Sequence, residues 1–144
     1  MPAARVAIDI EAPPQLVWRV LTAKEQWRYW NTFLYDRDPR VPLQRGRRLA
    51  LVLRCDPSGE EKLLAPTVTW LRAERHLQWV AALPGWRREC RFELEALGPN
   101  RTRYRHQHRF CGPLARALAR PASRRERPGL QRMARELKAY AERF

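Results

Sequence analysis

The sequence predicts a single α+β domain over residues 1–144, with an antiparallel sheet of about six or seven strands, two short helices after the first strand and a long C-terminal helix. Three observations predict this fold. Apolar residues alternate near the N-terminus, strand-like segments separated by turn residues fill the middle, and apolar residues recur at helical spacing near the C-terminus. A chain of this length suits one domain that buries about two-thirds of its unfolded surface.

The N-terminal segment has the pattern of a strand followed by two short helices. Apolar residues alternate with small or polar ones over residues 6–10, which is the period of a half-buried strand. The Pro13-Pro14 pair ends this strand, and because proline fits the first turn of a helix, residues 15–22 are predicted to be helical. A second short helix is expected to hold Trp27 and Trp30.

The middle of the chain has the pattern of a meandering antiparallel sheet. Turn-forming clusters at residues 56–59, 84–85 and 98–100 separate several apolar segments. The six strands predicted here are residues 34–41, 47–54, 63–73, 77–83, 87–97 and 101–110.

The last third of the chain is predicted to be helical in two pieces. Leu130, Met133 and Leu137 are spaced by three and four residues, so they share one face of the second piece, and their burial would contribute about 1.5 to 3 kcal/mol each. Arg120-Pro121 and Pro128-Gly129 should break or kink the helix, since proline lacks the backbone donor. The charged residues 124–127 between them are expected to form a solvated kink.

The last hairpin allows a register to be written from the sequence. If residues 98–100 form a three-residue loop, Leu97 faces Arg101 and the opposing residue numbers add to a constant along the ladder. One face then carries three cross-strand pairs of opposite charge, which stabilise a sheet by about 0.2 to 1 kcal/mol each. These pairs are Glu89 with Arg109, Glu93 with Arg105, and Glu95 with Arg103.

The other face of this hairpin should point toward the C-terminal helix and brings Cys90, His106 and His108 together. Three interpretations of this cluster stay open. In the first, the three groups are partly buried polar residues that find hydrogen-bond partners or line a solvated pocket. In the second, they bind zinc, although a fourth ligand is lacking. In the third, an imidazole activates the thiol or acts as a general base. The pairs on this face are Ala96 with Thr102, Leu94 with Tyr104, Phe92 with His106, and Cys90 with His108.

Charge and cysteine content narrow the classes of function. The net charge is +14, but the 26 arginines and 3 lysines are scattered along the chain, which does not favour nucleic-acid binding. The three cysteines form no CxxC pair, so neither a disulfide framework nor a zinc knuckle is indicated, and reduced thiols fit a cytoplasmic location. No apolar run is long enough to predict a membrane span or a secretion signal.

A spaced set of residues carries a resemblance to a known superfamily. The set comprises Ala12-Pro13-Pro14, Val17-Trp18, Trp27, Trp30-Asn31, Phe33, Arg91-Phe92-Glu93-Leu94 and Phe110-Cys111-Gly112. It resembles the SRPBCC superfamily, the helix-grip folds related to START lipid-transfer domains and polyketide cyclases. The resemblance implies a curved sheet wrapped around the C-terminal helix, with a cavity between them.

The resemblance also implies a function, which is the binding of a small, largely apolar molecule in that cavity. We expect no cofactor and no bound metal for this function. The alternative is an enzyme of the polyketide cyclase or dehydratase kind, with His106, His108 or Cys90 as the catalytic candidates. A regulatory protein with an unspecified protein partner is a third class. The residues expected to contact the small molecule are Trp30, Trp79, Cys90, Phe92, Tyr104, His106, His108, Phe110, Met133 and Leu137.

Overall fold

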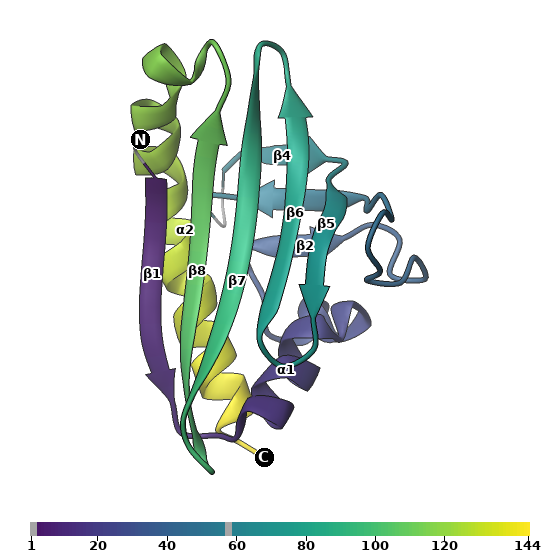
Figure 1. Cartoon of the computed structure of the whole chain (residues 1–144), viewed down its shortest axis with the longest axis vertical. Coiled ribbons are helices and arrows are strands. Elements are labelled where there is room, and N and C mark those ends of the chain that lie inside the picture. The colour runs from purple at the N-terminus through teal and green to yellow at the C-terminus, as the bar shows by residue number, and fades with distance from the viewer. Residues whose placement is uncertain (1–2, 57–58) are drawn as a thin grey trace.

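The structure is a computed structural model that describes residues 3–56 and 59–144, and it consists of two antiparallel sheets and a long helix (Figure 1). The strands are β1 (Ala3–Ile10), β2 (Leu34–Asp36), β3 (Leu51–Arg54), β4 (Glu61–Leu64), β5 (Thr67–Arg72), β6 (His76–Leu83), β7 (Trp86–Gly98) and β8 (Arg101–Cys111). The helices are α1 (Pro14–Thr22), the 3-10 helix η1 (Lys24–Tyr29) and α2 (Ala115–Ala141). The predicted α+β helix-grip fold is confirmed.

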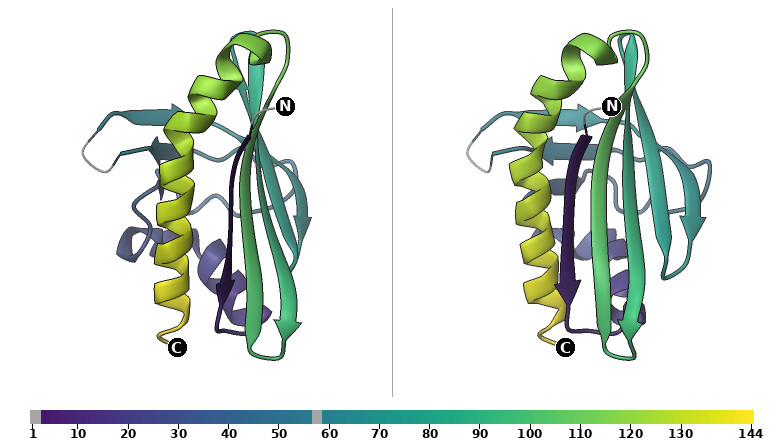
Figure 2. Two further views of the ribbon diagram at one scale, coloured as in Figure 1. Left: turned by 90° about the vertical axis from the view of Figure 1, so that its left-hand side faces the viewer. Right: turned by 60° about the vertical axis from the view of Figure 1, so that its left-hand side comes forward.

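The large sheet has the strand order β1-β8-β7-β6-β5, and the small sheet has the order β2-β3-β4. Figure 1 shows the strands of the small sheet running across those of the large sheet. Helix α2 lies along one face of the large sheet, against β1 and β8 (Figure 2). The side chains between helix and sheet form the main core.

The helix α2 is continuous, whereas the sequence predicted two helical pieces. Pro121 and Pro128 both lie inside it, and Figure 2 shows it bent in its N-terminal half, as the prolines require. The buried face of Leu130, Met133 and Leu137 holds the second half of the helix on the sheet. Packing of this face therefore outweighs the two lost backbone donors.

The predicted strand 63–73 is wrong, because it is two strands in different sheets. The break falls at Ala65-Pro66, between β4 and β5, where Pro66 has no N–H to donate to a ladder. The predicted strand 34–41 is also shorter in the structure, since β2 ends at Asp36. The described residues thus form eight strands in place of the expected six or seven.

The predicted register of the β7–β8 hairpin is confirmed over most of its length. Cys90 faces His108 and Phe92 faces His106, as the sequence predicted. The turn differs, since a bulge at Leu97 lets Gly98 pair with Arg101 and leaves a two-residue loop. The inward face of the hairpin is therefore fixed by its alternation of apolar and polar residues, independently of the turn.

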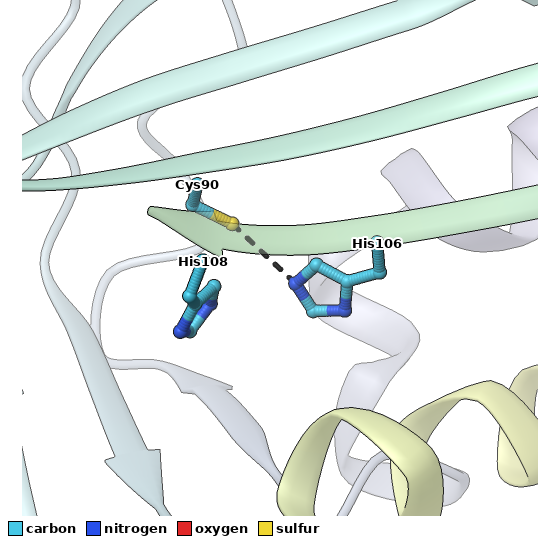
Figure 3. Close-up of side chains that lie close together, drawn as sticks. All are labelled: Cys90, His106 and His108. Carbon is cyan, nitrogen blue, oxygen red and sulfur yellow. Dashed lines mark hydrogen bonds between the residues drawn. The ribbon is translucent and has the colours of Figure 1, made fainter. Parts of the chain in front are cut away.

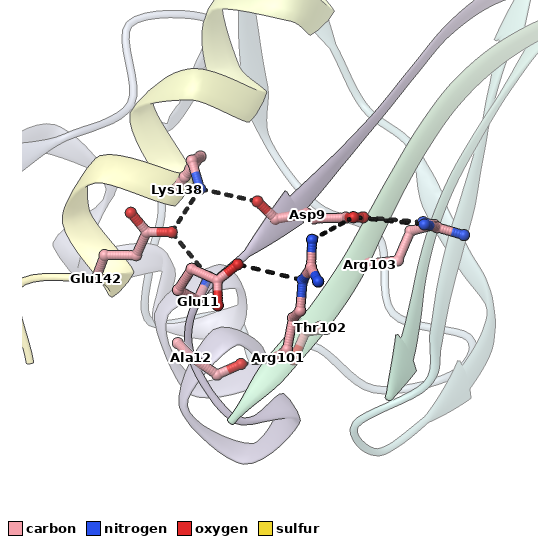
Figure 4. Close-up of polar contacts among 8 residues, drawn as sticks. All are labelled: Asp9, Glu11, Ala12, Arg101, Thr102, Arg103, Lys138 and Glu142. Atoms are coloured by element: carbon pink, nitrogen blue, oxygen red, sulfur yellow. Dashed lines mark hydrogen bonds and ion pairs between the residues drawn. The ribbon is translucent and has the colours of Figure 1, made fainter. Parts of the chain in front are cut away.

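The three predicted pairs of opposite charge on the outer face do lie opposite one another, but the side-chain ion pairs of Arg103 and Arg105 have other partners. Arg103 reaches Asp9 on the neighbouring β1, with Nε 2.9 Å from Oδ1 (Figure 4). Arg105 pairs with Glu95 at 2.9 Å. Long arginine side chains reach diagonal and next-strand partners, which a two-strand register does not include. The outer charges thus tie β1 to β8.

The C-terminal end of α2 is fastened to the end of β1 (Figure 4). Lys138 donates from Nζ to the backbone oxygen of Asp9 at 2.9 Å, and Glu142 accepts from the backbone N–H of Glu11 at 2.7 Å. Lys138 and Glu142 also pair with each other at 2.6 Å.

Among the described residues, no helix has the length and apolar character that crossing a membrane requires.

Candidate functional site

Cys90, His106 and His108 lie together on the inward face of the large sheet. Strand β7 supplies the thiol and β8 supplies both imidazoles, because residues two apart on a strand point to the same side. All three side chains are buried, and their potential metal-binding atoms lie within 4.8 Å of one another. Figure 3 shows the Cys90 thiol directed at His106, with Sγ 3.5 Å from Nε2.

A buried carboxylate from the helix completes this cluster. Glu126 of α2 lies with Oε1 2.6 Å from Nδ1 of His108, and Arg88 of β7 donates to both of its oxygens at 3.1 and 2.6 Å. Burial opposes ionisation of Glu126, but the hydrogen bond and charge of His108 and the charge of Arg88 outweigh it, so its pKa is lowered to about 2. Glu126 is thus a buried anion between two strands and the helix.

Burial keeps the side chains of Cys90 and His106 neutral. It raises the pKa of the Cys90 thiol well above its ordinary value. It also lowers the pKa of His106 well below its ordinary value, and the neighbouring His108 adds to that effect. The Cys90 side chain is therefore a thiol at neutral pH, and the protein on its own does not make it a thiolate nucleophile.

Aromatic rings surround His106. Phe92 stacks on its imidazole with ring centroids 4.1 Å apart, and Trp79 meets Phe92 edge to face at 5.2 Å. Tyr104 and Phe33 also contact the His106 ring. These rings exclude solvent from one side of the cluster.

The other predicted pocket residues are distributed over two cores. Met133 and Leu137 pack in the main core, whereas Phe110 lies in a second, smaller cluster near the start of α2. Trp30 stacks on Tyr140 of α2, with ring centroids 6.1 Å apart. Phe110 is the one member of the predicted set that lies in this second cluster.

The sequence prediction missed Glu126 and Arg88. Glu126 was assigned to a solvated kink, but its side chain is fully buried. It lies four residues before Leu130 and so continues the apolar face of the helix, which is the signal that could have placed it inside. Arg88 precedes Cys90 by two residues on the inward face of β7, and the same alternation predicts its burial.

A cleft of about 470 Å³ opens at the N-terminal half of α2, between the helix and strands β4, β6 and β7. Its walls include Leu64, Trp86 and the buried Arg88 on the strands, and Arg125 on the helix. None of the ten residues predicted to contact a small molecule lines this cleft or the three other surface pockets of the described residues. The residues that line the cleft are Lys62, Leu63, Leu64, Leu83, Trp86, Arg88, Leu118, Pro121, Ala122 and Arg125.

The chain has a helix-grip fold, and this fold together with the family match that follows confirms the SRPBCC resemblance. Over residues 11–142, the sequence matches the family described as "Activator of Hsp90 ATPase homolog 1-like protein", and the chain belongs to this family. A comparison with curated proteins gives no match.

Solved structures with the same fold come from several sources. A START superfamily protein from Mycobacterium smegmatis has a TM-score of 0.74 at 14% identity, with 99% of each chain covered. A protein from Nitrosomonas europaea has a TM-score of 0.68 at 22% identity, with 96% of each chain covered. DynU16, a protein in the dynemicin biosynthetic locus, has a TM-score of 0.69 at 17% identity, with 99% of this chain and 48% of DynU16 covered. At identities of 14 to 22%, these structures show that the fold is shared and nothing more.

Proposed function

We propose that this domain binds a small, largely apolar molecule that carries an acidic group, in the cleft between the N-terminal half of α2 and the sheet. The observation that carries the proposal is the guanidinium of Arg88. This side chain lines the cleft, is 3% exposed, and has one nitrogen, Nη1, without a hydrogen-bond partner. A buried donor of this kind is satisfied by an anionic or carbonyl oxygen.

The walls of the cleft suit the apolar part of such a molecule. Leu64, Leu83 and Trp86 line the sheet side, and Leu118 and Ala122 line the helix side. Leu118 is 40% exposed, so part of its apolar surface is open to a bound molecule. A volume of about 470 Å³ is within the usual range for small-molecule pockets.

The charged residues of the cleft favour an anion. Lys62, Arg88 and Arg125 are its three cationic lining residues, and its described lining includes no acidic side chain. Glu126 neutralises one of these three charges, because it forms a buried ion pair with Arg88. The net positive charge of the cleft would orient an amphiphilic acid with its head group inward and its tail along the leucines.

The residues that the sequence predicted to contact a bound molecule lie deeper in the protein than the lining of the cleft. Trp79, Phe92 and Tyr104 are at most 2% exposed and belong to the main core. Their contact with a bound molecule, like that of the other predicted residues, stays a prediction and would require a larger opening between α2 and the sheet. The cytoplasmic location also stays a prediction, and the three free cysteines support it.

The cyclase-like enzyme is the alternative function. Glu126 holds Nδ1 of His108, which is the arrangement that orients an imidazole as a general acid or base. His108 is 1% exposed, however, and lines none of the four pockets described above. Binding at the cleft therefore has the stronger support.

Calorimetric titration with decanoate and decanol tests the proposal, because the two molecules share a tail and differ in charge. We expect decanoate to bind more tightly than decanol. Arg125→Gln should weaken decanoate binding by about 3- to 5-fold, the usual worth of an exposed ion pair. Decanol binding should not change.

Arg124→Gln is the matched control, since Arg124 is also exposed on α2 but does not line the cleft. This variant should bind decanoate as the unmodified protein does. Equal affinities for decanoate and decanol, or equal losses in the two arginine variants, would contradict a directed acid site.

A further inference from the structure

Cys90, His106 and His108 have the chemical identity of a zinc ligand set. Thiolate sulfur and imidazole nitrogen are the ligands that Zn²⁺ prefers, and two histidines with one cysteine give three protein ligands. The three side chains come from the adjacent strands β7 and β8, which are paired without a break from Arg87 to Ala96. Their positions are therefore fixed by the sheet and not by a loop.

The spacing of the ligand atoms fits an ion between them. Sulfur and nitrogen bound to tetrahedral zinc, at about 2.3 and 2.0 Å from the ion, lie about 3.5 Å apart. Sγ of Cys90 and Nε2 of His106 are 3.5 Å apart. The ligand atoms of all three residues lie within 4.8 Å, so the widest separation needs to shorten by about 1 Å to close on an ion.

Glu126 supplies the outer partner that metal-binding histidines usually have. Its Oε1 lies 2.6 Å from Nδ1 of His108, which leaves Nε2 of that ring as the coordinating atom. Arg88 holds the same carboxylate with two hydrogen bonds, so the carboxylate and the imidazole are both oriented. Carboxylate–histidine pairs of this kind set the tautomer and ring orientation at zinc sites.

We propose that Cys90, His106 and His108 form a binding site for one Zn²⁺ ion, with Glu126 as the outer partner of His108. Zinc with the Cys90 thiolate carries one net positive charge, and because Glu126 also pairs with Arg88, the whole group of ion, thiolate, carboxylate and guanidinium keeps a net charge of +1. Three protein ligands leave the fourth tetrahedral position for water or another small ligand. The proposal does not depend on the molecule that binds in the cleft.

Refolding with Co²⁺, a spectroscopic substitute for zinc, tests the proposal, because a buried site fills most readily as the chain folds. The full chain is unfolded in denaturant with a reductant and refolded with one equivalent of Co²⁺. We expect about one Co²⁺ per chain after gel filtration, with a near-ultraviolet thiolate-to-cobalt absorption band. One equivalent of Zn²⁺ should remove that band. Refolded protein that retains no cobalt would overturn the proposal.

Two variants assign the band to Cys90. Cys55→Ser/Cys111→Ser removes the other two cysteines and leaves Cys90 as the only thiol, so it should keep the band. Cys90→Ser should lose it. A band that disappears in the double variant, or persists in Cys90→Ser, would mean that another thiol binds the metal. If Cys90→Ser does not fold, the double variant alone decides the assignment.

Discussion

His108 and Glu126 join strand β8 to the helix α2, with Nδ1 and Oε1 only 2.6 Å apart at a point that solvent does not reach. Arg88 of β7 holds the same carboxylate, so three elements meet at one buried anion. An anion at this depth is stable only while its partners are in place. The contact therefore fixes where the helix lies on the sheet, and with it the width of the adjacent cleft.

Removing the charge of Glu126 should cost much of the stability of the fold. Glu126→Gln leaves the Arg88 guanidinium buried without its counter-ion, and we expect a loss of about 3 to 5 kcal/mol in the free energy of unfolding. Urea unfolding measures this change. Glu61→Gln is the control, because Glu61 pairs with Arg54 at the surface at 3.6 Å and should lose less than about 1 kcal/mol. Similar losses in both variants would mean that the buried pair contributes no more to the free energy of unfolding than the surface pair does.

The metal-free protein should lose stability as the pH falls, in two steps. Burial lowers the pKa of His106 well below 6.5, so the unfolded chain takes up this proton first and stability declines below about pH 6.5. The pKa of Glu126 is lowered from 4.5 to about 2, so its contribution, on the order of 3 kcal/mol, is present above pH 4.5 and is lost between pH 4.5 and 2.

Urea midpoints measured between pH 8 and pH 3 check both steps. In His106→Gln, the decline that begins near pH 6.5 should be smaller, while the decline below pH 4.5 should remain. A decline between pH 6.5 and 4.5 that is equally steep in the variant would show that another group causes the upper step.

Gly129 allows the close approach of α2 to Phe33. A Cβ at this position would overlap the Phe33 ring, which is fully buried and lies against His106 and His108. Gly129→Ala should therefore destabilise the protein by about 1 to 3 kcal/mol, although alanine favours a helix by about 1 kcal/mol over glycine. Thermal unfolding measures the net effect. Gly98→Ala, where a Cβ meets nothing within 4 Å, should stay within about 0.5 kcal/mol, and a stabilised Gly129→Ala would disprove the overlap.

Arg132 connects α2 to the small sheet. Its guanidinium donates to the backbone oxygens of Arg54 at 2.6 Å, Cys55 at 3.2 Å and Thr32 at 3.2 Å. An ammonium cannot reproduce this planar set of donors, so Arg132→Lys should lose about 1 to 3 kcal/mol. Hydrogen exchange of the β2 and β3 amides should also become faster. The exposed Arg135 gives the control, since Arg135→Lys should change neither quantity.

The sequence predicted the inward face of the β7–β8 hairpin because alternation along two paired strands depends only on neighbouring residues. It therefore placed Cys90 beside His106 and His108 correctly. The three predicted pairs of the outer face do lie opposite one another, but the side-chain ion pairs have other partners, since Arg103 reaches Asp9 on β1, which is more than ninety residues away in the sequence. A partner on a third strand cannot be read from a two-strand register.

The buried charges were missed for a related physical reason. Four charged residues in a row, 124–127, favour a solvated segment, and only the helical spacing from Leu130 distinguishes Glu126 from its neighbours. The cleft could not be predicted either, because its walls come from three strands and from a helix bent at prolines. Local patterns predict which residues share a face, but the distances between faces are set by tertiary packing.

A nuclear magnetic resonance titration with decanoate tests whether the cleft binds an amphiphilic acid, because it locates the bound molecule on the chain. As decanoate is added, we expect shifts in the signals of the cleft lining, namely the backbone amides of Leu63, Leu64 and Ala122 and the indole of Trp86. All of these shifts should fit one dissociation constant. Unchanged spectra up to the solubility limit of decanoate would contradict the account. Shifts centred on Trp79 and Phe92 would contradict it as well, since they would place the molecule in the main core and not in the cleft.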